Sequence, residues 1–396
     1  MDKKVLKERL ELACRWITDV AQVKDEALLP NERRRHLHKT WSGAVRGEYR
    51  VSTRQWDYFC PVWHTGQAVK ALTMAADFVG PFAMEGAKAG GEFILTNAIR
   101  EGEDRGLILA HEDDVAKVNT SAILECLDGL LHLGEATKDA RFQEAALAAL
   151  EWVAERAYIH GKGLFLDCYD PATRQFVPER YGSEGRPLLD DAVFVKGYRL
   201  SDNPLFSEIA EETAARLLQD EEPSGNWINY APCNAEVGYI HPRHAYWWGS
   251  SLLEVHRMTG DPRFREAFDR SVWWYAAAMR RDGGIFRNTY REFNTDSFGH
   301  ATSGVGCAVS MFLDFLAIDK SEEVLPYIEM GLNYCLRVQF TKPSDANLKG
   351  AILEKVLPPD GTDASPYYIR DLGTIFFIQA ASKYLAAGLG DGAPVE

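Results

Sequence analysis

The sequence lacks the features that mark disulfide-rich, nucleic-acid-binding and membrane proteins. Its seven cysteines are scattered without C-x-x-C spacing, which is typical of reduced thiols. Lys and Arg number 44 against 58 Asp and Glu, and the resulting net charge of -14 argues against nucleic acid as a partner. No apolar run approaches the ~18 residues of a membrane span. No signal core follows the N-terminus, so we expect a cytoplasmic protein without a membrane partner.

Several catalytic motifs are also missing. There is no H-E-x-x-H or comparable ligand spacing, and His241 and His244 are three residues apart with a proline between them, which disfavours a metal site. The sequence has no G-x-x-x-x-G-K-[ST] phosphate loop and no G-x-S-x-G nucleophile elbow. Chemistry must therefore come from other residue types.

Aromatic residues are abundant, with 10 Trp, 16 Tyr and 19 Phe. Most aromatic side chains are core material. Several here, however, stand beside Gly, His and Asn in segments that read as loops, such as Trp56-Asp57-Tyr58 and Tyr246-Trp-Trp-Gly249. Flat apolar faces bordered by hydrogen-bonding groups suit sugar rings.

A unit of two helices recurs along the chain. An aromatic and polar loop leads into an apolar helix rich in small residues, and a short turn leads into an amphipathic helix. The copies cover residues 61–95, 118–156, 189–218, 244–280, 300–338 and 368–389, after a first helix at 4–24 and an irregular stretch at 31–50. The turn motif Thr-x-Asp-x-Arg-Phe occurs at 137–142 and 259–264, where Asp should cap the second helix and Phe should pack back.

Six helix pairs, the last completed by the N-terminal helix, predict an all-α fold. We expect the hairpins to close into an (α/α)6 toroid that forms one domain over residues 1–396. An open solenoid is the alternative, although solenoid repeats of ~34–47 residues are shorter than the ~50–70 residues between copies here.

In such a ring the inner helices begin at a common mouth, so the loops before them should hold the site. These loops concentrate Asp, His, Arg, Tyr and Trp. The acid clusters 112–114 and 190–191 supply paired carboxylates, which cleave glycosidic bonds as proton donor and as base or charge stabiliser. Burial or a like-charge neighbour raises the pKa of one of them. The alternative is that these acids are ordinary helix caps.

The remaining loop residues suggest a carboxylate-bearing substrate. Arg243 beside His241 and His244, and Arg287 beside Tyr290, suit a carboxylate held by paired hydrogen bonds. A structural network between loops is the alternative. The expected substrate-binding residues are Trp56, Trp63, His64, Glu236, His241, Arg243, His244, Trp248, Arg287, Tyr290 and His300.

The layout resembles the six-hairpin glycosidases, in particular the unsaturated glucuronyl and rhamnogalacturonyl hydrolases, over nearly the whole chain. The features that carry the resemblance are Trp56-Asp57 and Trp63, His111-Glu-Asp113, Leu188-Leu-Asp190, Trp247-Trp-Gly249, Gly260-Asp261 and Asp296-Ser297. They stand, in this order, around the first five inner helices.

The resemblance implies a glycoside hydrolase that hydrates a 4,5-unsaturated uronic acid without a metal or cofactor. Asp190 would be the general acid and base, and Asp113 the assisting carboxylate. Asp191 and Asp114 offer a second acid at each position, so Asp191 is also a catalytic candidate. The expected partner is an oligosaccharide that carries a terminal uronic acid, and a homodimer is left open.

Other activities stay open. The Arg, Tyr and His residues at 241–246 and 287–300 also resemble polysaccharide lyases with a helical toroid. There, Glu236 or Asn234 would neutralise the uronate, and Tyr290, His241 or His244 would take the C5 proton. A saturated β-glucuronidase, an epimerase using two His, and a non-enzymatic helical-repeat protein are further alternatives.

Overall fold

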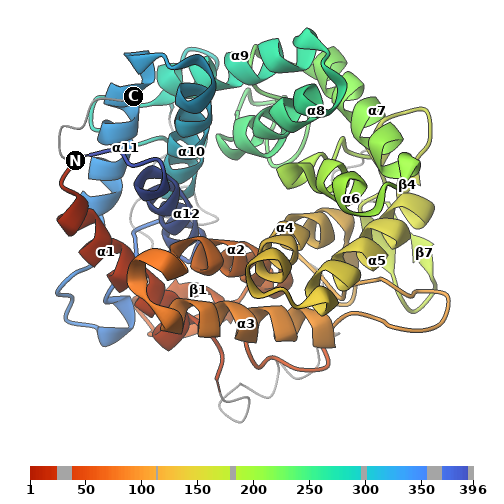
Figure 1. Cartoon of the computed structure of the whole chain (residues 1–396), viewed down its shortest axis with the longest axis horizontal. Helices are drawn as coiled ribbons and strands as arrows, with labels where there is room; N and C mark the ends of the chain where they lie inside the picture. Colours follow the sequence, from red (N-terminus) through yellow and green to blue (C-terminus); the bar gives the residue numbers. More distant parts are fainter. Residues whose placement is uncertain (25–37, 113–114, 179–183, 296–300, 355–367, 391–396) are drawn as a thin grey trace.

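Two concentric layers of helices form a ring (Figure 1). The structure is a computed structural model that describes residues 1–24, 38–112, 115–178, 184–295, 301–354 and 368–390. The inner layer holds α2 (Pro61–Val79), α4 (Thr120–Thr137), α6 (Val193–Ser201), α8 (Ser251–Thr259), α10 (Thr302–Asp319) and α12 (Leu372–Ala386). The outer layer holds α1 (Lys3–Arg15), α3 (Pro81–Thr96), α5 (Ala140–Arg156), α7 (Pro204–Asp220), α9 (Pro262–Ala278) and α11 (Leu325–Arg337).

The ring closes as the repeat pattern predicts. Each inner helix packs on the outer helix that follows it, and α12 packs on α1, so the N-terminal helix completes the sixth hairpin. Short helices adjoin four of these elements: η1 (Trp16–Ala21), η4 (Asp190–Ala192), η5 (Ala245–Ser250) and η6 (Glu322–Val324). A further short helix, η7 (Ala346–Leu348), lies in the segment after α11. The N-terminal ends of the inner helices and the long loops before them therefore share one end of the ring, which we call the mouth.

The predicted turn chemistry is confirmed in both copies of the motif. Asp139 accepts a hydrogen bond from the backbone N–H of Arg141 at 3.1 Å and caps α5. Asp261 accepts one from the N–H of Arg263 at 2.9 Å and caps α9. Because each cap satisfies a helix donor that would otherwise lack a partner, the outer helices begin at defined residues.

The inner helices pack closely. Gly66 of α2 and Gly129 of α4 face each other, and a Cβ atom built on Gly129 would lie 2.1 Å from the backbone oxygen of Gly66. Glycine is therefore required where these two backbones meet. Among the described residues, α10 alone is long and apolar enough to cross a membrane, which corrects the expectation that no run approaches this length. Most of α10 is buried within the protein, as in a core helix.

The described loops contain three small antiparallel sheets. In the first, β1 (Gly47–Arg50) pairs with both β2 (Gln55–Tyr58) and β8 (Tyr368–Arg370). The second joins β3 (Val118–Asn119), β6 (Cys168–Asp170) and β7 (Gln175–Phe176), and the third joins β4 (Tyr158–Ile159) and β5 (Leu164–Phe165). The sequence predicted an irregular stretch at 31–50, which is wrong for β1, because one partner strand lies at the other end of the chain.

We expect Gly129→Ala to lower the free energy of unfolding by about 1–3 kcal/mol, because the added methyl group forces α2 and α4 apart. Gly134→Ala on the same helix is the matched control, since its Cβ would chiefly meet the flexible Gln143 side chain, 2.7 Å from Cγ. Denaturant unfolding of both variants measures the difference. Equal stability of the two variants would contradict the close backbone contact.

Candidate active site

The central face of α4 carries a stripe of polar side chains. Ser121, Glu125, Asp128 and His132 follow one another at spacings of four, three and four residues, which places them on one side of the helix. The rest of α4 is largely apolar and buried. Because an inner helix has no water-facing outer side, this stripe marks the surface that faces the centre of the ring.

Two buried carboxyl groups, Asp190 of η4 and Glu125 of α4, interact electrostatically at the mouth. Burial raises the pKa of Asp190 to about 8, against the opposing charge of Arg186 and with support from Asp191. Burial, followed by the charge of Asp190, also raises the pKa of Glu125 well above its usual value. Asp190 Oδ2 and Glu125 Oε2 have no hydrogen-bond partner among the described residues. The pair can therefore hold a proton near neutral pH and present it to a ligand.

Asp191 has a different environment from its neighbour. Lys70 Nζ donates to Asp191 Oδ1 at 2.9 Å, and Gln67 Nε2 donates to Oδ2 at 2.7 Å. Both carboxylate oxygens are thus occupied by protein groups. Asp190 Oδ2, in contrast, has no hydrogen-bond partner among the described residues. The structure therefore distinguishes two adjacent acids that the sequence could not.

The backbone at this turn is strained. Asp191 has φ 50° and ψ 16°, and Ala192 has φ 53° and ψ 34°, so two consecutive residues other than glycine adopt the left-handed conformation. Each such residue costs on the order of 1–3 kcal/mol and persists only where surrounding contacts hold it. Strain of this kind is concentrated at functional sites.

A group of arginines also lies at the mouth, and one of them, Arg243, interacts electrostatically with Glu125. The guanidinium carbon of Arg243 lies 4.9 Å from the ring centroid of Trp247 and 5.3 Å from that of Trp63. Its Nε and one Nη have no partner among the described residues, and neither has the indole nitrogen of Trp63 or Trp247. Burial, followed by the charges of Arg370 and Arg243, lowers the pKa of Arg287 to about 9. Although the whole chain is acidic, this region favours an anion.

Arg370 differs from the other two arginines because it has a partner within the protein. Its Nε donates to Glu48 Oε1 at 2.5 Å, between β8 and β1, where the two residues are directly opposite. Burial opposes the charge of Arg370, but Glu48 and Glu354 together hold its pKa above the ordinary value. Arg243 and Arg287 are therefore the arginines with donors to spare.

Three of the four predicted histidines, His64, His241 and His244, have different settings. His64 Nδ1 lies 2.6 Å from Asp371 Oδ1, and its Nε2 has no partner among the described residues. Burial and the charges of Arg243 and Arg287 lower the pKa of His241 well below its usual value, so its ring is neutral. Both ring nitrogens of His244 lie 3.1 Å from backbone carbonyl oxygens, which fixes this side chain within the protein.

Other predicted residues lie away from this cluster. The Trp56 ring packs 5.1 Å from Tyr49, and Trp248 packs against His244 at 4.3 Å within the core. Glu236 is exposed, and the Tyr290 ring lies 5.0 Å from that of Tyr239. Asp113 and His300 fall outside the described residues. The structure thus gathers Asp190, Trp63, His241, Arg243 and Arg287 around the mouth, whereas Trp56, Trp248, Glu236 and Tyr290 have other neighbours.

Sequence reasoning missed Glu125, Lys70 and Arg370. The signal for Glu125 was available, since a polar stripe within an apolar helix indicates a lined cavity in a ring of helices. A similar signal exists for Lys70, which is a buried lysine on the largely apolar helix α2. No comparable local signal marks Arg370, because its partner Glu48 lies 322 residues earlier.

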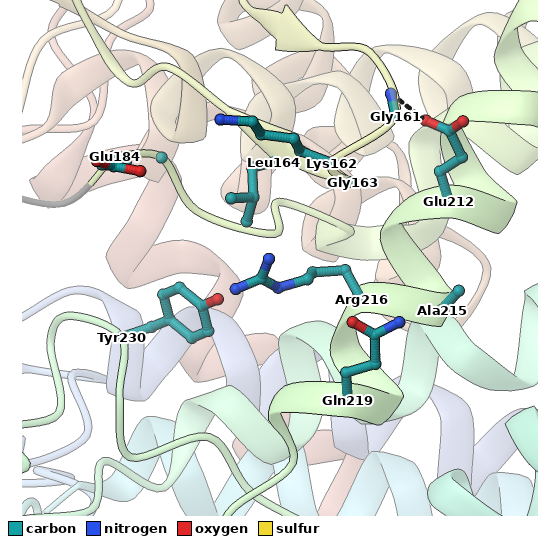
Figure 2. A pocket seen from close by; sticks show the side chains of 11 residues that line it. Gly161, Lys162, Gly163, Leu164, Glu184, Glu212, Ala215, Arg216, Gln219 and Tyr230 are labelled. Carbon is teal, nitrogen blue, oxygen red and sulfur yellow. Dashed lines mark hydrogen bonds between the residues drawn. The ribbon is translucent and has the colours of Figure 1, made fainter.

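Two cavities lie outside this cluster. One of about 280 Å³ lies among the six inner helices and is lined by Lys70, Asp128 and Asp191, among others. A larger groove of about 610 Å³ lies between α7 and the β4–β5 hairpin (Figure 2). There, Glu212 accepts a hydrogen bond from the N–H of Gly161, and Arg216 and Tyr230 are both bonded to Asp220. None of the predicted site residues lines this groove.

Metal ligation finds no support in the described part of the chain. No group of three or more His, Cys, Asp or Glu side chains there has the arrangement needed to hold a metal ion. What the cluster offers is proton transfer by carboxyl or imidazole groups and recognition of an anion by arginine.

We expect Asp190→Asn to flatten the pH dependence of stability. Between the ordinary pKa near 3.8 and about 8, the folded state keeps a proton on Asp190 that the unfolded state releases. The free energy of unfolding therefore falls with rising pH, by about 1.4 kcal/mol per pH unit for one such group. Asparagine cannot ionise, so the variant should lose much of this slope and be the more stable protein near pH 7.

Denaturant unfolding from about pH 5 to about pH 8 measures this slope. Asp191→Asn is the matched control. It breaks the ion pair with Lys70 and should destabilise the protein throughout the range. An unchanged slope in Asp190→Asn would mean that Asp190 is ionised in the folded protein.

Comparisons with known proteins agree on the fold. No protein-family model matches the chain, and no curated protein matches it. An unsaturated glucuronyl hydrolase specific for heparin is similar with a TM-score of 0.70 and 12% identity over 98% of each chain. Cellobiose 2-epimerase from Spirochaeta thermophila is similar with a TM-score of 0.68 and 14% identity over 98% of each chain. An α-1,6-mannanase from Salegentibacter is similar with a TM-score of 0.59 and 12% identity over 97% of this chain and 99% of the mannanase. The fold prediction is thus confirmed: the chain has the (α/α)6 toroid fold that these carbohydrate-active enzymes share.

Proposed function

We propose that this protein removes a terminal 4,5-unsaturated uronic acid from a short oligosaccharide by hydration. One arrangement carries the proposal: a buried, proton-holding carboxyl pair, Asp190 and Glu125, shares the mouth with Arg243 and Arg287. The similarity to an unsaturated glucuronyl hydrolase supports the same choice, although epimerases share the fold.

The arginines would bind the uronate carboxylate. Arg243 has unpaired donors and lies between the rings of Trp63 and Trp247, which offer flat faces and free indole N–H groups for a sugar. Arg287 adds a second positive charge. The net charge of -14 opposes a long polyanion, so a short oligosaccharide is the better substrate.

Asp190 would supply the proton. In the proposed reaction the neutral carboxyl of Asp190 adds its proton to C4 of the double bond. The resulting carboxylate accepts a proton from water as the water oxygen bonds to C5. This proton transfer leaves Asp190 protonated again. The C5–O5 bond of the resulting hemiketal then breaks, so that C5 becomes a ketone and C1 a hemiacetal. The hemiacetal collapses to an aldehyde at C1 and releases the rest of the oligosaccharide as an alcohol. Glu125 would act as the assisting carboxyl, a role that the family resemblance gave to Asp113, which lies outside the described residues.

An epimerase is the second candidate, and one observation favours it. His64 faces Asp371 at 2.6 Å through one ring nitrogen and leaves the other free, which is how a carboxylate orients a histidine base. The neutral His241 could serve as a second base. The lyase has less support, because Glu236 is exposed and Tyr290 packs on Tyr239.

We expect the protein to consume an unsaturated uronyl disaccharide, seen as loss of absorbance of the conjugated double bond. Asp190→Asn and Glu125→Gln should each lower kcat by about 10²–10⁴-fold, because general acid–base catalysis contributes that much. Asp314→Asn is the control, since this acid of an inner helix pairs with Lys383 and lines the cavity among the helices.

Other substrates separate the alternatives. A gain of absorbance with saturated polyuronate would replace the hydrolase by a lyase. Release of uronic acid from a saturated glucuronide alone would indicate a β-glucuronidase. Exchange of the C2 hydrogen of a reducing disaccharide for deuterium, without any cleavage, would indicate the epimerase.

Arg243→Met should raise KM for the uronate substrate about 10- to 100-fold, because a charge-assisted contact to the substrate carboxylate is lost. Methionine keeps much of the contact with Trp63 and Trp247, so folding should be preserved. Arg257→Met, at an arginine of α8 that pairs with Glu254, serves as the control. A KM that stays the same in Arg243→Met would remove Arg243 from carboxylate binding.

A further inference from the structure

We propose that Lys70 is a positioning residue, which fixes the turn at Asp191 so that Asp190 presents its carboxyl group to the substrate. The inference rests on the proposed catalytic role of Asp190. Lys70 itself touches neither Asp190 nor the arginines in the hydrogen bonds of the described residues, so it would act through Asp191.

Lys70 connects α2 to three other parts of the ring. Its Nζ lies 2.9 Å from Asp191 Oδ1, 2.8 Å from Asp128 Oδ2 and 3.4 Å from Tyr246 Oη. These partners belong to η4, α4 and η5, whereas Lys70 belongs to α2. Lys70 donates hydrogen bonds to Asp191 and Tyr246 and forms an ion pair with Asp128, so this buried cation has a partner in each of the three elements.

Gln67, one turn earlier on α2, completes the arrangement. Its Nε2 donates to Asp191 Oδ2 at 2.7 Å and to the backbone oxygen of Glu125 at 2.7 Å. Gln379 Nε2 in turn donates to Gln67 Oε1 at 3.0 Å. The same face of α2 therefore holds both the turn that carries Asp190 and the backbone that carries Glu125.

The strained backbone explains why such support is needed. Asp191 and Ala192 both have positive φ, a conformation that relaxes unless contacts hold it. The contacts within the protein that occupy both oxygens of Asp191 come from α2. If Lys70 were lost, the turn could relax and Asp190 would move away from the mouth.

A purely structural role for Lys70 would be charge neutralisation, and the two roles can be separated. Lys70→Met leaves the Asp191 carboxylate buried without its cation, which destabilises any protein. The double variant Lys70→Met with Asp191→Asn removes both charges and should restore much of the stability. It does not restore the contacts that hold the turn.

The experiment compares the wild type, the double variant and Lys196→Met. Lys196 also pairs with Asp128, at 2.5 Å, and forms no ion pair with Asp191 among the described residues, so it is the matched control. Denaturant unfolding, kcat and KM on the unsaturated uronyl disaccharide are measured for each. The infrared carbonyl band of protonated Asp190, identified by its loss in Asp190→Asn, reports the position of this carboxyl group without turnover.

We expect the double variant to lose about 100-fold in kcat, the effect of a misplacement of roughly 1 Å, with KM changed less than about threefold. Its Asp190 band should shift, whereas Lys196→Met should keep both kcat and the band. Recovery of kcat together with stability in the double variant would overturn the proposal. If the wild type does not turn over this substrate, the proposed function fails. The positioning role of Lys70 is then tested by the infrared band alone, and an unshifted Asp190 band in the double variant would overturn it.

Discussion

A carboxyl group buried inside a closed ring of helices must either pair with a cation or keep its proton, because burial disfavours the unpaired charge. Both outcomes occur within a few residues here. Asp191 and Asp128 pair with Lys70, whereas burial leaves Asp190 and Glu125 with raised pKa values. The paired acids hold the structure together, and the protonated acids provide the reactivity that we propose. A change to Lys70 would therefore affect both groups.

Closure of the ring brings residues from the first and last parts of the chain together at the mouth. The strand β8 returns from the end of the chain to pair with β1, and α12 packs between α10 and α2. This closure places Arg370 opposite Glu48 and Asp371 against His64. The two members of each of these contacts come from opposite ends of the chain, so an open array of the same hairpins would not bring them together.

The similar solved structures include a hydrolase, an epimerase and a mannanase, so the ring alone does not determine the reaction. The side chains at the mouth carry that information. A protonated acid pair beside arginines suits hydration of an unsaturated uronide, whereas a histidine oriented by a carboxylate suits proton abstraction beside a carbonyl. This chain contains both arrangements, so the substrate that it turns over distinguishes the two proposals.

The sequence by itself determined the helical hairpins and their order, because apolar periodicity and the Asp caps at 139 and 261 are local signals. It also indicated that the inner-helix loops carry the polar residues, and it named Asp190, Trp63, Arg243 and Arg287. Only the tertiary structure decided which of Asp190 and Asp191 is paired, that Glu125 joins Asp190, and that His244 and Trp248 are packed inside the protein. The reason is physical: a helical period shows which side chains share a face, whereas the burial and partners of a charge depend on segments far away in the chain.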